Sequence, residues 1–456
     1  MKVCNLETVI TFEDILRMAD YIRMEEPQVV ITPSFSWIKN SLQEISALLF
    51  RTEIEEAQQS IRMLKSRCMD FATTLISEEQ ICQSAQEQIE TRFAYILQLS
   101  NSTLNLLDDK ELLASGEYLS SILIASYLKS KGAKVSLLDS SELIRLGADN
   151  KPDMETIAAQ IKAVTGLVPA SVYVMQSRLC KNAYGEVEYL PKVGADLYAT
   201  YVAAAFEAHE LTLWMQTKGL YTQYGENVYK GHDSYSLTFE EAESFINAGI
   251  RLISPACLTL AHEHHIALHL MDSKSINRRS ICINDEESQH SIKAVVARKN
   301  IDYIRLRSLG VISSFQFLEK SLAIFSKYKV PVYLMTSSSA NISMAVELSM
   351  DTFYLIRHEL ASFAEIVVEN NIASICVLGQ FDWDKSSIEG KIIELLRDMP
   401  ILMISYGSDN SSVSVVVREK DREQALCILS NSFLGTQFST ESNTRIFREE
   451  YNAFIV

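Results

Sequence analysis

The sequence contains no long apolar run and no closely paired cysteines. No stretch of about 18 or more apolar residues occurs, so a transmembrane helix is not expected. The N-terminus MKVCNLETVITFED has acids where a secretion signal needs a basic start and an apolar core. The eight cysteines include no C-x-x-C pair, which favours reduced thiols over a zinc site or a disulfide framework. We therefore expect a soluble cytoplasmic protein that has no membrane partner.

A surplus of basic residues is also missing. Lys and Arg number 42 against 58 Asp and Glu, so the formal net charge is -16. Binding to a nucleic-acid backbone needs a concentrated surplus of positive charge. Nucleic acid is therefore not an expected partner.

The length and composition are those of a folded protein with several domains. A chain of 456 residues is too long for one ordinary core, so two or three domains are expected. With 47% hydrophobic and 22% charged residues, the chain should fold.

Short apolar strands alternate with helical patterns in the first part of the chain. The strands are QVVITP (28–33), AKVSLLD (133–139) and ELTLWM (210–215). This alternation predicts an α/β domain with a largely parallel sheet over residues 1–275. A stretch rich in Glu, Gln and Ser with recurring Ile, Leu and Met interrupts the alternation. We predict a helical insertion of two or three helices there, at about 41–107.

A polar and charged stretch, residues 276–300, predicts a linker before a differently built region at 301–456. There the order strand, helix, strand, strand occurs twice, and a helix at 421–433 follows the second copy. The first copy covers 303–308, 317–328, 330–338 and 342–348, and the second covers 374–379, 387–399, 400–407 and 412–418. Two copies of a small β-α-β-β-α-β unit explain this period.

One candidate site lies in ELLASGEYLSSILIASYLKSKGAKVSLL, residues 111–138. The pattern predicts a turn at Ser115, Gly116 and Glu117, followed by an amphipathic helix and a short strand. A carboxylate at such a turn could satisfy amide groups at the start of the helix. The alternative is that Glu117 faces a substrate, and both interpretations stay open at this point.

Two other polar clusters have simple structural explanations. In AHEHHIALH (261–269), His262, His265 and His269 fall on one face if the segment is helical. A metal site would need these side chains to converge, usually with a carboxylate or Cys nearby, so packing is the favoured interpretation and no metal ligand is assigned. Asp196 precedes an Ala-rich helix and could cap it.

Several segments resemble aspartokinases, in the order that this family has them. SGEYLSSILIASYLKSKGAKVSLLDSSELI resembles the substrate loop and its helix, and AGIRLISPACLTLAHEHHIALHLMDSKS resembles the segment that closes the catalytic domain. YIRLRS, FLEKSLAIFSKYKVPVYLMTSSSANISMAVEL and LMISYGSDNSSVSVVV are similar to the paired ACT regulatory domains. The similarity extends over nearly the whole chain.

The resemblance implies an α/β fold: an amino-acid-kinase-like sandwich with a largely parallel sheet, followed by two ferredoxin-like ACT domains. The family's reaction transfers the γ-phosphoryl group of MgATP to the side-chain carboxylate of L-aspartate, the first step toward lysine, threonine and methionine. ATP and Mg²⁺ are the implied cofactors. Pairs of ACT domains in the family associate side by side through their sheets, which implies a homodimer.

On the substrate side, the resemblance assigns Ser115, Gly116, Glu117 and Ser120 to binding L-aspartate or another small amino acid. Glu117 matches the family's Glu that helps to hold the substrate's amino group, and a carboxylate beside turn amides suits a zwitterion.

For effector binding, the resemblance indicates the hydroxyls of Thr336, Ser337 and Ser338. Tyr333 and Ser339 stand at positions where the family has acids. Lysine is therefore a less suitable effector than a neutral amino acid, and a loss of effector response is the other alternative.

The nucleotide side departs from the family pattern. Phosphoryl transfer needs Gly-rich turns and a Lys or Arg to neutralise phosphate charge. Where the family has a Lys, Phe, Gly, Gly run, this chain has Val3 at the Lys, and Asn5 and Leu6 at the two Gly. Lys2 is one position away, and a shift of one residue in a strand moves a side chain to the other face.

Two further nucleotide elements survive in part. In Pro191–Asp196 the charge of Lys192, the Gly194 and the Asp196 remain, and the resemblance makes Lys192 and Asp196 the catalytic candidates. In WMQTKGLYTQYGEN, Gly219, Tyr221 and Thr222 match, and Gly194 completes the nucleotide-binding set. Met215 and Gln216 replace the family's Thr and Asp.

Together these departures predict a catalytically impaired member of the family that acts as an amino-acid-binding or regulatory homologue, because each lost electrostatic contact is worth about 10²–10³-fold in rate. A genuine aspartokinase is then a candidate partner. The alternative is an active aspartate kinase whose ATP site is compensated by Lys2, Lys39 or Lys192. A changed phosphoryl acceptor is a third interpretation that the weak ATP motifs disfavour.

Overall fold

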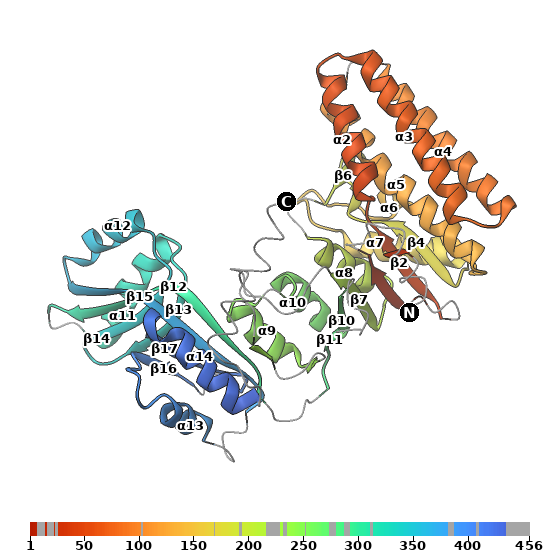
Figure 1. Cartoon of the computed structure of the whole chain (residues 1–456). Coiled ribbons are helices and arrows are strands. Elements are labelled where there is room, and N and C mark those ends of the chain that lie inside the picture. Colours follow the sequence, from red (N-terminus) through yellow and green to blue (C-terminus); the bar gives the residue numbers. More distant parts are fainter. Residues whose placement is uncertain are drawn as a thin grey trace. The chain divides into compact units, whose positions relative to one another are not determined.

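The computed structural model describes residues 1–6, 14–15, 22, 26–101, 104–167, 169–190, 194–215, 229–230, 235–250, 252–272, 280–286, 292–310, 313–381, 387–406 and 410–434 (Figure 1). The chain divides into two compact units. The first comprises 1–218 and 253–285, and the second comprises 219–252 and 286–456.

The first unit is built on a mostly parallel sheet in the order β3-β4-β2-β1-β7-β10-β11. Strand β11, the last of this order that belongs to the first unit, is antiparallel to β10. Strands β2 and β4 are buried along their whole length, as the apolar runs of a sheet covered on both faces should be. The bounds are β1 (Lys2–Asn5), β2 (Gln28–Thr32), β3 (Val135–Leu137), β4 (Val172–Gln176), β7 (Glu210–Met215), β10 (Ala267–Asp272) and β11 (Ser280–Ile283). A separate hairpin pairs β5 (Leu179–Lys181) with β6 (Val187–Tyr189).

Long helices α2 (Ser36–Phe50), α3 (Ile54–Leu75), α4 (Glu79–Ser100) and α5 (Leu106–Ser130) lie side by side as a bundle (Figure 1). Each contributes an apolar stripe to one core that continues onto the sheet. The helices predicted at about 41–107 are therefore present. Shorter helices complete the unit: α6 (Ser140–Leu143), α7 (Met154–Leu167), α8 (Ala195–Ala205) and α10 (Pro255–Glu263).

The turn predicted at Ser115–Glu117 is wrong. These residues lie in the interior of α5, which begins at Leu106, where Asn105 and Asp108 form a capping box. The helix continues through Gly116 because its interior is buried, and tertiary packing outweighs the low helix propensity of one glycine. Stabilisation of a helix start therefore does not explain Glu117.

The second unit is organised around the strand order β13-β14-β12-β15-β17-β16, and β8 (Tyr229–Lys230) also pairs with β12. Its strands are β9 (Tyr235–Leu237), β12 (Ile292–Ser308), β13 (Val332–Ser337), β14 (Asn341–Val346), β15 (Ala364–Gly379), β16 (Met403–Ser405) and β17 (Ser412–Arg418). Its helices are α9 (Phe239–Asn247), α11 (Ser314–Lys327), α12 (Met350–Leu360), α13 (Ile388–Leu395) and α14 (Glu419–Leu434).

Two ferredoxin-like halves share the long strands β12 and β15. The first half runs from the end of β12 through α11, β13, β14 and α12 to the start of β15, over one apolar core. The second half runs from the end of β15 through α13, β16, β17 and α14, over another core. The start of β12 supplies its fourth strand. The ladder shifts register near Asn300 and Asn371, which both have positive φ, as Asn tolerates well.

The predicted fold class is confirmed by this arrangement. Within the range predicted as a linker, residues 280–283 form β11 and β12 begins at Ile292. The predicted domain limits themselves stay a prediction. Among the described helices, none combines the length and apolarity that crossing a bilayer requires.

Candidate functional site

The carboxyl ends of the parallel strands bring several polar side chains together in the first unit. Asn5 ends β1, Thr32 ends β2 and Gln176 ends β4, and all three are buried. Ligands of open α/β sheets bind at this edge. Helix α5 packs against β2 and β4, so its inward-facing residues belong to the same region.

Glu117 is a buried carboxyl group on α5 with one described hydroxyl donor. Its relative exposure is 6%. The hydroxyl of Tyr189, at the end of β6, donates to Glu117 Oε2 over 2.9 Å. The phenol thus holds the carboxyl group in one orientation.

The charge state of Glu117 is set by competition between burial and its neighbours. Loss of water raises the pKa of Glu117 to about 7, against the lowering effects of the Tyr189 hydrogen bond and of the charges on Arg178 and Lys39. Burial disfavours the charged form, whereas hydrogen bonds and cations favour it. The group is therefore poised between its neutral and ionised forms near neutral pH.

Arg178 comes directly after the buried strand β4 and Ser177. Its φ is 60°, an uncommon conformation for a residue other than glycine, and such positions often occur at functional sites. Its guanidinium carbon lies 6.0 Å from the centre of the Tyr189 ring. A carboxyl group, a phenol and a guanidinium therefore meet at one place, and this set can hold a ligand that carries both an ammonium and a carboxylate group.

Gly116 allows α5 to approach the loop before α2. A Cβ at this position would clash with Ser34 Oγ and would come within 3.2 Å of Leu42 Cδ1. One turn later, Ser120 Oγ accepts from the Phe35 amide over 2.9 Å and donates to the Gly116 carbonyl over 2.8 Å. Gly116 and Ser120 therefore fix the packing of α5 at the site, and Ser120's hydroxyl is occupied in doing so.

Ser115 makes different contacts. Its hydroxyl accepts from Arg92 Nε over 3.0 Å and donates to the Glu111 carbonyl over 3.1 Å. Ser115 is completely buried. These bonds tie α4 to α5, and the substrate contact assigned to Ser115 stays a prediction.

Among the described residues, β1 presents no free cation at the carboxyl end of the sheet. Val3 and Leu6 are each 0% exposed. Lys2 begins β1 and lies at the opposite, amino end of the strand, where its Nζ is 3.4 Å from Glu26 Oε2 and 3.3 Å from Glu210 Oε2. Asn5 Nδ2 donates to the Ala195 carbonyl over 3.3 Å, whereas its buried Oδ1 accepts no hydrogen bond from the described residues. The edge therefore offers an acceptor where a phosphate would need donors.

Asp196 does not cap its own helix. Gly194 is the N-cap of α8 and makes no side-chain cap bond, so the capping interpretation of Asp196 is wrong. Asp196 lies in the first turn, and its Oδ2 accepts from the Ser254 amide over 2.6 Å at the start of α10. It thereby joins α8 to α10. Lys192, Gly219, Tyr221 and Thr222 lie outside the described residues.

The effector candidates occupy an edge of the second unit. Thr336 and Ser337 end β13, Ser338 follows, and all three are exposed. On the same strand, the Tyr333 hydroxyl donates to Glu347 Oε2 over 2.7 Å. Effector binding by these hydroxyls stays a prediction.

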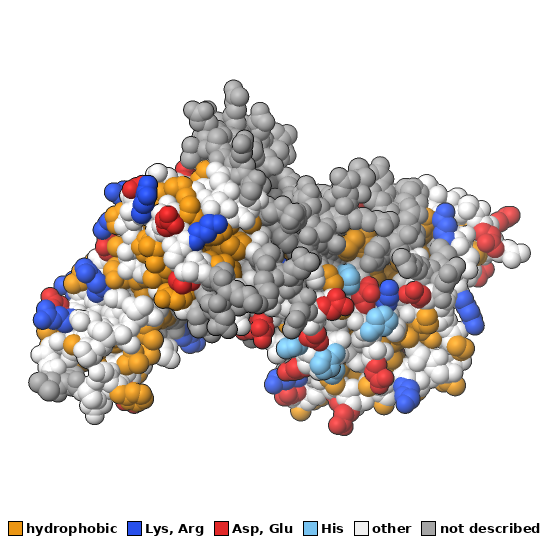
Figure 2. Space-filling model, turned by 90° about the horizontal axis from the view of Figure 1, so that it is seen from below, with side chains coloured by type: hydrophobic (Ala, Val, Ile, Leu, Met, Phe, Trp, Pro, Cys, Tyr) orange, Lys and Arg blue, Asp and Glu red, His pale blue; other side chains and the backbone are white. Residues whose placement is uncertain are grey.

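The histidines of residues 261–269 do not share a helical face. Helix α10 ends at Glu263, and His269 lies in β10. His262 Nε2 and His265 Nδ1 are 3.6 Å and 3.3 Å from the carboxylate of Asp285. Figure 2 shows histidine side chains among acidic ones on this exposed face. Within the part of the chain that is described, no three His, Cys, Asp or Glu side chains are arranged to hold a metal ion.

Sequence reasoning missed Tyr189 and Arg178. Tyr189 is 72 positions from Glu117 and lies on a three-residue strand, which has too little periodicity to predict its direction. The signal for Arg178 was its place just after an apolar strand, where polar residues of α/β sheets gather.

Comparison with known proteins gives one consistent result. The amino acid kinase family matches residues 68–272, and an ACT domain matches 375–433. The chain is 23% identical over 331 residues to lysine-sensitive aspartokinase 3 of Escherichia coli, covering 69% of this chain and 73% of that protein. It is 25% identical over 345 residues to chloroplastic aspartokinase 3 of Arabidopsis thaliana, covering 71% of this chain and 61% of that one.

Solved structures share the fold. Aspartokinase III of E. coli in complex with aspartate and ADP superposes with a TM-score of 0.60 at 21% identity, covering 96% of this chain and 100% of that one. The aspartate kinase of Clostridium acetobutylicum superposes with a TM-score of 0.69 at 16% identity, covering 95% and 99%.

Proposed function

Because the chain belongs to the aspartokinase family, we propose that its first unit binds L-aspartate or another small amino acid at Glu117 and transfers phosphate from ATP poorly. The observation that carries this proposal is a contrast within one sheet edge. The amino-acid side has a buried carboxyl group with a phenol and two cations nearby. At the end of β1, the phosphate side has Asn5, whose Oδ1 accepts no hydrogen bond from the described residues, and the buried apolar Leu6. Lys2 lies at the opposite end of that strand and is paired with acidic residues.

The groups at Glu117 match the two charges of an amino acid. An ionised Glu117 would accept from the ligand's ammonium group, and Arg178 would donate to its carboxylate. Guanidinium–carboxylate bonds are among the stronger hydrogen bonds in proteins. Tyr189 orients Glu117 for this contact.

The described residues do not fit a triphosphate at the end of β1. ATP and Mg²⁺ would need backbone amides and a cation there, and the observed groups are the Asn5 acceptor and the buried Leu6. A carbonyl oxygen without a donor repels phosphate oxygens. We therefore derive no phosphoryl-transfer step for this chain.

We also propose a regulatory role for amino-acid binding at Glu117. A ligand regulates only if it binds two states of the protein with different affinity. The C-terminal ACT region offers a second amino-acid site at Thr336–Ser338, and a genuine aspartokinase is the candidate partner. The alternative function is full kinase activity through a compensated ATP site. Its support among the described residues is Lys39, whose positive charge lies near Glu117.

Self-association is the assembly we propose. Strand β13 is the edge of its sheet, and its Val332 and Met335 are 37% and 39% exposed. Exposed edges of this kind pair with other strands. Sedimentation should give a dimer that Met335→Lys weakens, and a wild-type monomer would contradict the assembly.

The test of function is isothermal titration with L-aspartate and, separately, with a non-hydrolysable MgATP analogue. Aspartate binding that Glu117→Gln removes, without nucleotide binding, supports the proposal. Glu111→Gln is the matched control, because Glu111 lies on the same helix and accepts from Tyr95 in a similar pair. Nucleotide binding with ADP release would establish the active kinase instead.

Proton release gives a second, independent readout. An ammonium group beside Glu117 favours the ionised form, so binding should lower its pKa and release a proton below about pH 7. Titrations in buffers of different ionisation enthalpy measure this release. Affinity for L-aspartate should therefore be weaker at acidic than at alkaline pH, and a pH-independent affinity would exclude Glu117 as the ammonium partner.

A further inference from the structure

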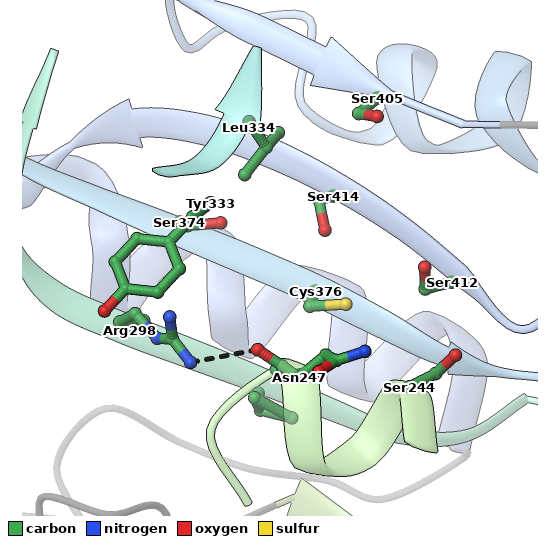
Figure 3. A pocket seen from close by; sticks show the side chains of 12 residues that line it. Ser244, Asn247, Arg298, Tyr333, Leu334, Ser374, Cys376, Ser405, Ser412 and Ser414 are labelled. Carbon is green, nitrogen blue, oxygen red and sulfur yellow. Dashed lines mark hydrogen bonds between the residues drawn. The ribbon is translucent and has the colours of Figure 1, made fainter. Parts of the chain in front are cut away.

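A cavity of about 200 Å³ lies on the sheet of the second unit (Figure 3). Strands β12, β13, β15, β16 and β17 line it, together with α9 and the residue that follows α9. A water molecule occupies roughly 30 Å³ in the liquid. The cavity therefore has room for several waters or for one metabolite of amino-acid size.

Small side chains at alternate positions of neighbouring strands create this space. Ser374 and Cys376 of β15 line the cavity, as do Ser412 and Ser414 of β17. The residues between them, such as Ile375, face the apolar core beneath α13 and α14, because successive side chains of a strand point to opposite faces. The cavity is thus on the face away from those helices, and hydroxyl groups dominate its wall.

Arg298 supplies the positive charge of the cavity. Among the twelve described residues that line it, none is acidic and Arg298 alone is charged. Arg298 is 8% exposed. Its Nη2 donates to the Asn247 carbonyl over 3.0 Å, and its guanidinium carbon lies 3.8 Å from the centre of the Tyr333 ring (Figure 3).

This guanidinium has donors to spare. Arginine has five N–H donors, and in the described part of the chain Arg298 makes the one hydrogen bond to Asn247 and no ion pair. Buried charges in proteins are usually paired with an opposite charge. An anion in the cavity would accept hydrogen bonds from the remaining N–H donors of Arg298 and would supply the opposite charge.

The surroundings hold the guanidinium in place. Gly249 has a φ of 91°, and a Cβ there would come within 2.6 Å of Arg298 Nη2. Helix α9 is fixed by the buried pair of Lys293 Nζ and Glu241 Oε2, 2.7 Å apart. The cation is therefore positioned before any ligand arrives, which reduces the entropy lost on binding.

We propose that this cavity binds a small organic carboxylate of amino-acid size. Its carboxylate accepts from Arg298, and the rest of the molecule makes hydrogen bonds with the hydroxyls of Ser374, Ser405 and Ser414. A hydroxyl can donate or accept, so the second polar group of the ligand need not be charged. The site is separate from Glu117, and the proposal stands whether or not the first unit binds aspartate.

The test is a titration of the full chain carrying Glu117→Gln, which removes the contribution of the first unit. The probes are the individual L-amino acids, pyruvate, succinate and inorganic phosphate, and binding is measured by thermal shift and calorimetry. At least one carboxylate should bind. Arg298→Gln should weaken it roughly 10- to 100-fold, the usual loss for a hydrogen bond to a charged group.

Two variants separate binding from folding. Arg305→Gln makes the same change at an exposed residue of the same strand, and affinity should be unchanged. Ser414→Leu fills the cavity while leaving Arg298 intact, and it should abolish binding without loss of circular dichroism signal. The proposal would be overturned if no carboxylate bound or if phosphate were the sole ligand. It would also be overturned if the Arg298→Gln and Ser414→Leu proteins bound the carboxylate as tightly as the parent protein does.

Discussion

At the scale of single residues, Glu117 is deeply buried, and among the described residues it accepts a hydrogen bond from one hydroxyl group, that of Tyr189. The burial that raises its pKa to about 7 is larger in effect than Tyr189, Arg178 and Lys39 together. An enzyme or receptor can use such a group because small changes in its surroundings move it between two charge states. An amino-acid ammonium is one such change.

The raised pKa predicts how Glu117 affects stability. The folded-state value of about 7 exceeds the ordinary 4.5, so the folded protein holds this proton more tightly than the unfolded chain. The contribution of Glu117 is fully present below about pH 4.5 and is lost as pH rises to about 7. The free energy of unfolding of the wild type should fall relative to Glu117→Gln by up to about 3 kcal/mol over this window.

Hydrogen exchange of the α5 amides at about pH 5 and about pH 8 would measure this difference. Glu111→Gln serves again as the control and should leave the slope unchanged. An identical pH dependence in Glu117→Gln and wild type would mean that Glu117 ionises in the folded protein as it does in water.

The sequence points to Glu117 as a candidate, but its local pattern predicts the wrong structure. Ser-Gly-Glu is a common turn pattern, and here Gly116 is instead the point where α5 approaches the loop before α2. Nothing in the local sequence distinguishes these uses of glycine, because the close neighbour, Ser34, is far away along the chain.

At the scale of elements, two helical glycines should respond oppositely to alanine. Gly116→Ala places a Cβ against Ser34 and Leu42, and overpacking costs about 1–3 kcal/mol. A Cβ added at Gly166, in the last turn of α7, would meet no atom within 4 Å, so Gly166→Ala should stabilise by about 0.5–1 kcal/mol through helix propensity alone. Thermal denaturation of both variants checks the signs, and stabilisation by both would contradict the close contact.

The packing of helix α9 should depend on the buried ion pair between Lys293 and Glu241. Lys293 also donates to the Ser236 carbonyl over 2.6 Å, and Lys293 and Glu241 are 8% and 1% exposed at their side chains. Lys293→Met leaves a buried carboxylate behind, a change that costs about 3–5 kcal/mol. Adding Glu241→Gln should recover part of this loss. Denaturant unfolding of the single and double variants measures it, and additive losses would show that the two groups act separately.

Most strands of the second unit were predictable because each has alternating apolar residues and ends at a turn. The assignment of α9 to the second unit was not predictable from the sequence. This helix is flanked in sequence by segments of the first unit, and the sequence carries no signal that residues 219–252 belong with residues 286–456. Only long-range contacts, such as Lys293 with Glu241, decide this.

At the scale of the whole molecule, the two ferredoxin-like halves should unfold together. Phe317 belongs to the core of the first half and Leu429 to that of the second. Both halves pair along β12 and β15. Phe317→Ala should cost about 3–5 kcal/mol and Leu429→Ala about 2–5 kcal/mol, and each should weaken protection in both halves.

Hydrogen exchange at β14 and β17 checks this coupling, because each strand belongs to one half only. Phe317→Ala should speed exchange in β17 as well as in β14. Unchanged exchange in β17 would mean that the halves are independent despite their shared strands.

The shared strands also determine the order in which the chain can assemble during synthesis. The start of β12 leaves the ribosome before any residue of the first half, yet its partners in β15, opposite Val295 and Ala297, are made only after that half is complete. The edge of β12 that pairs with β15 therefore waits for its partner while the neighbouring half is already able to fold, although β8 is made earlier and can pair with Ala294 and Val295 at the other edge. Waiting edges of this kind are prone to aggregation, so the newly made chain is most vulnerable in the interval before β15 and β17 emerge.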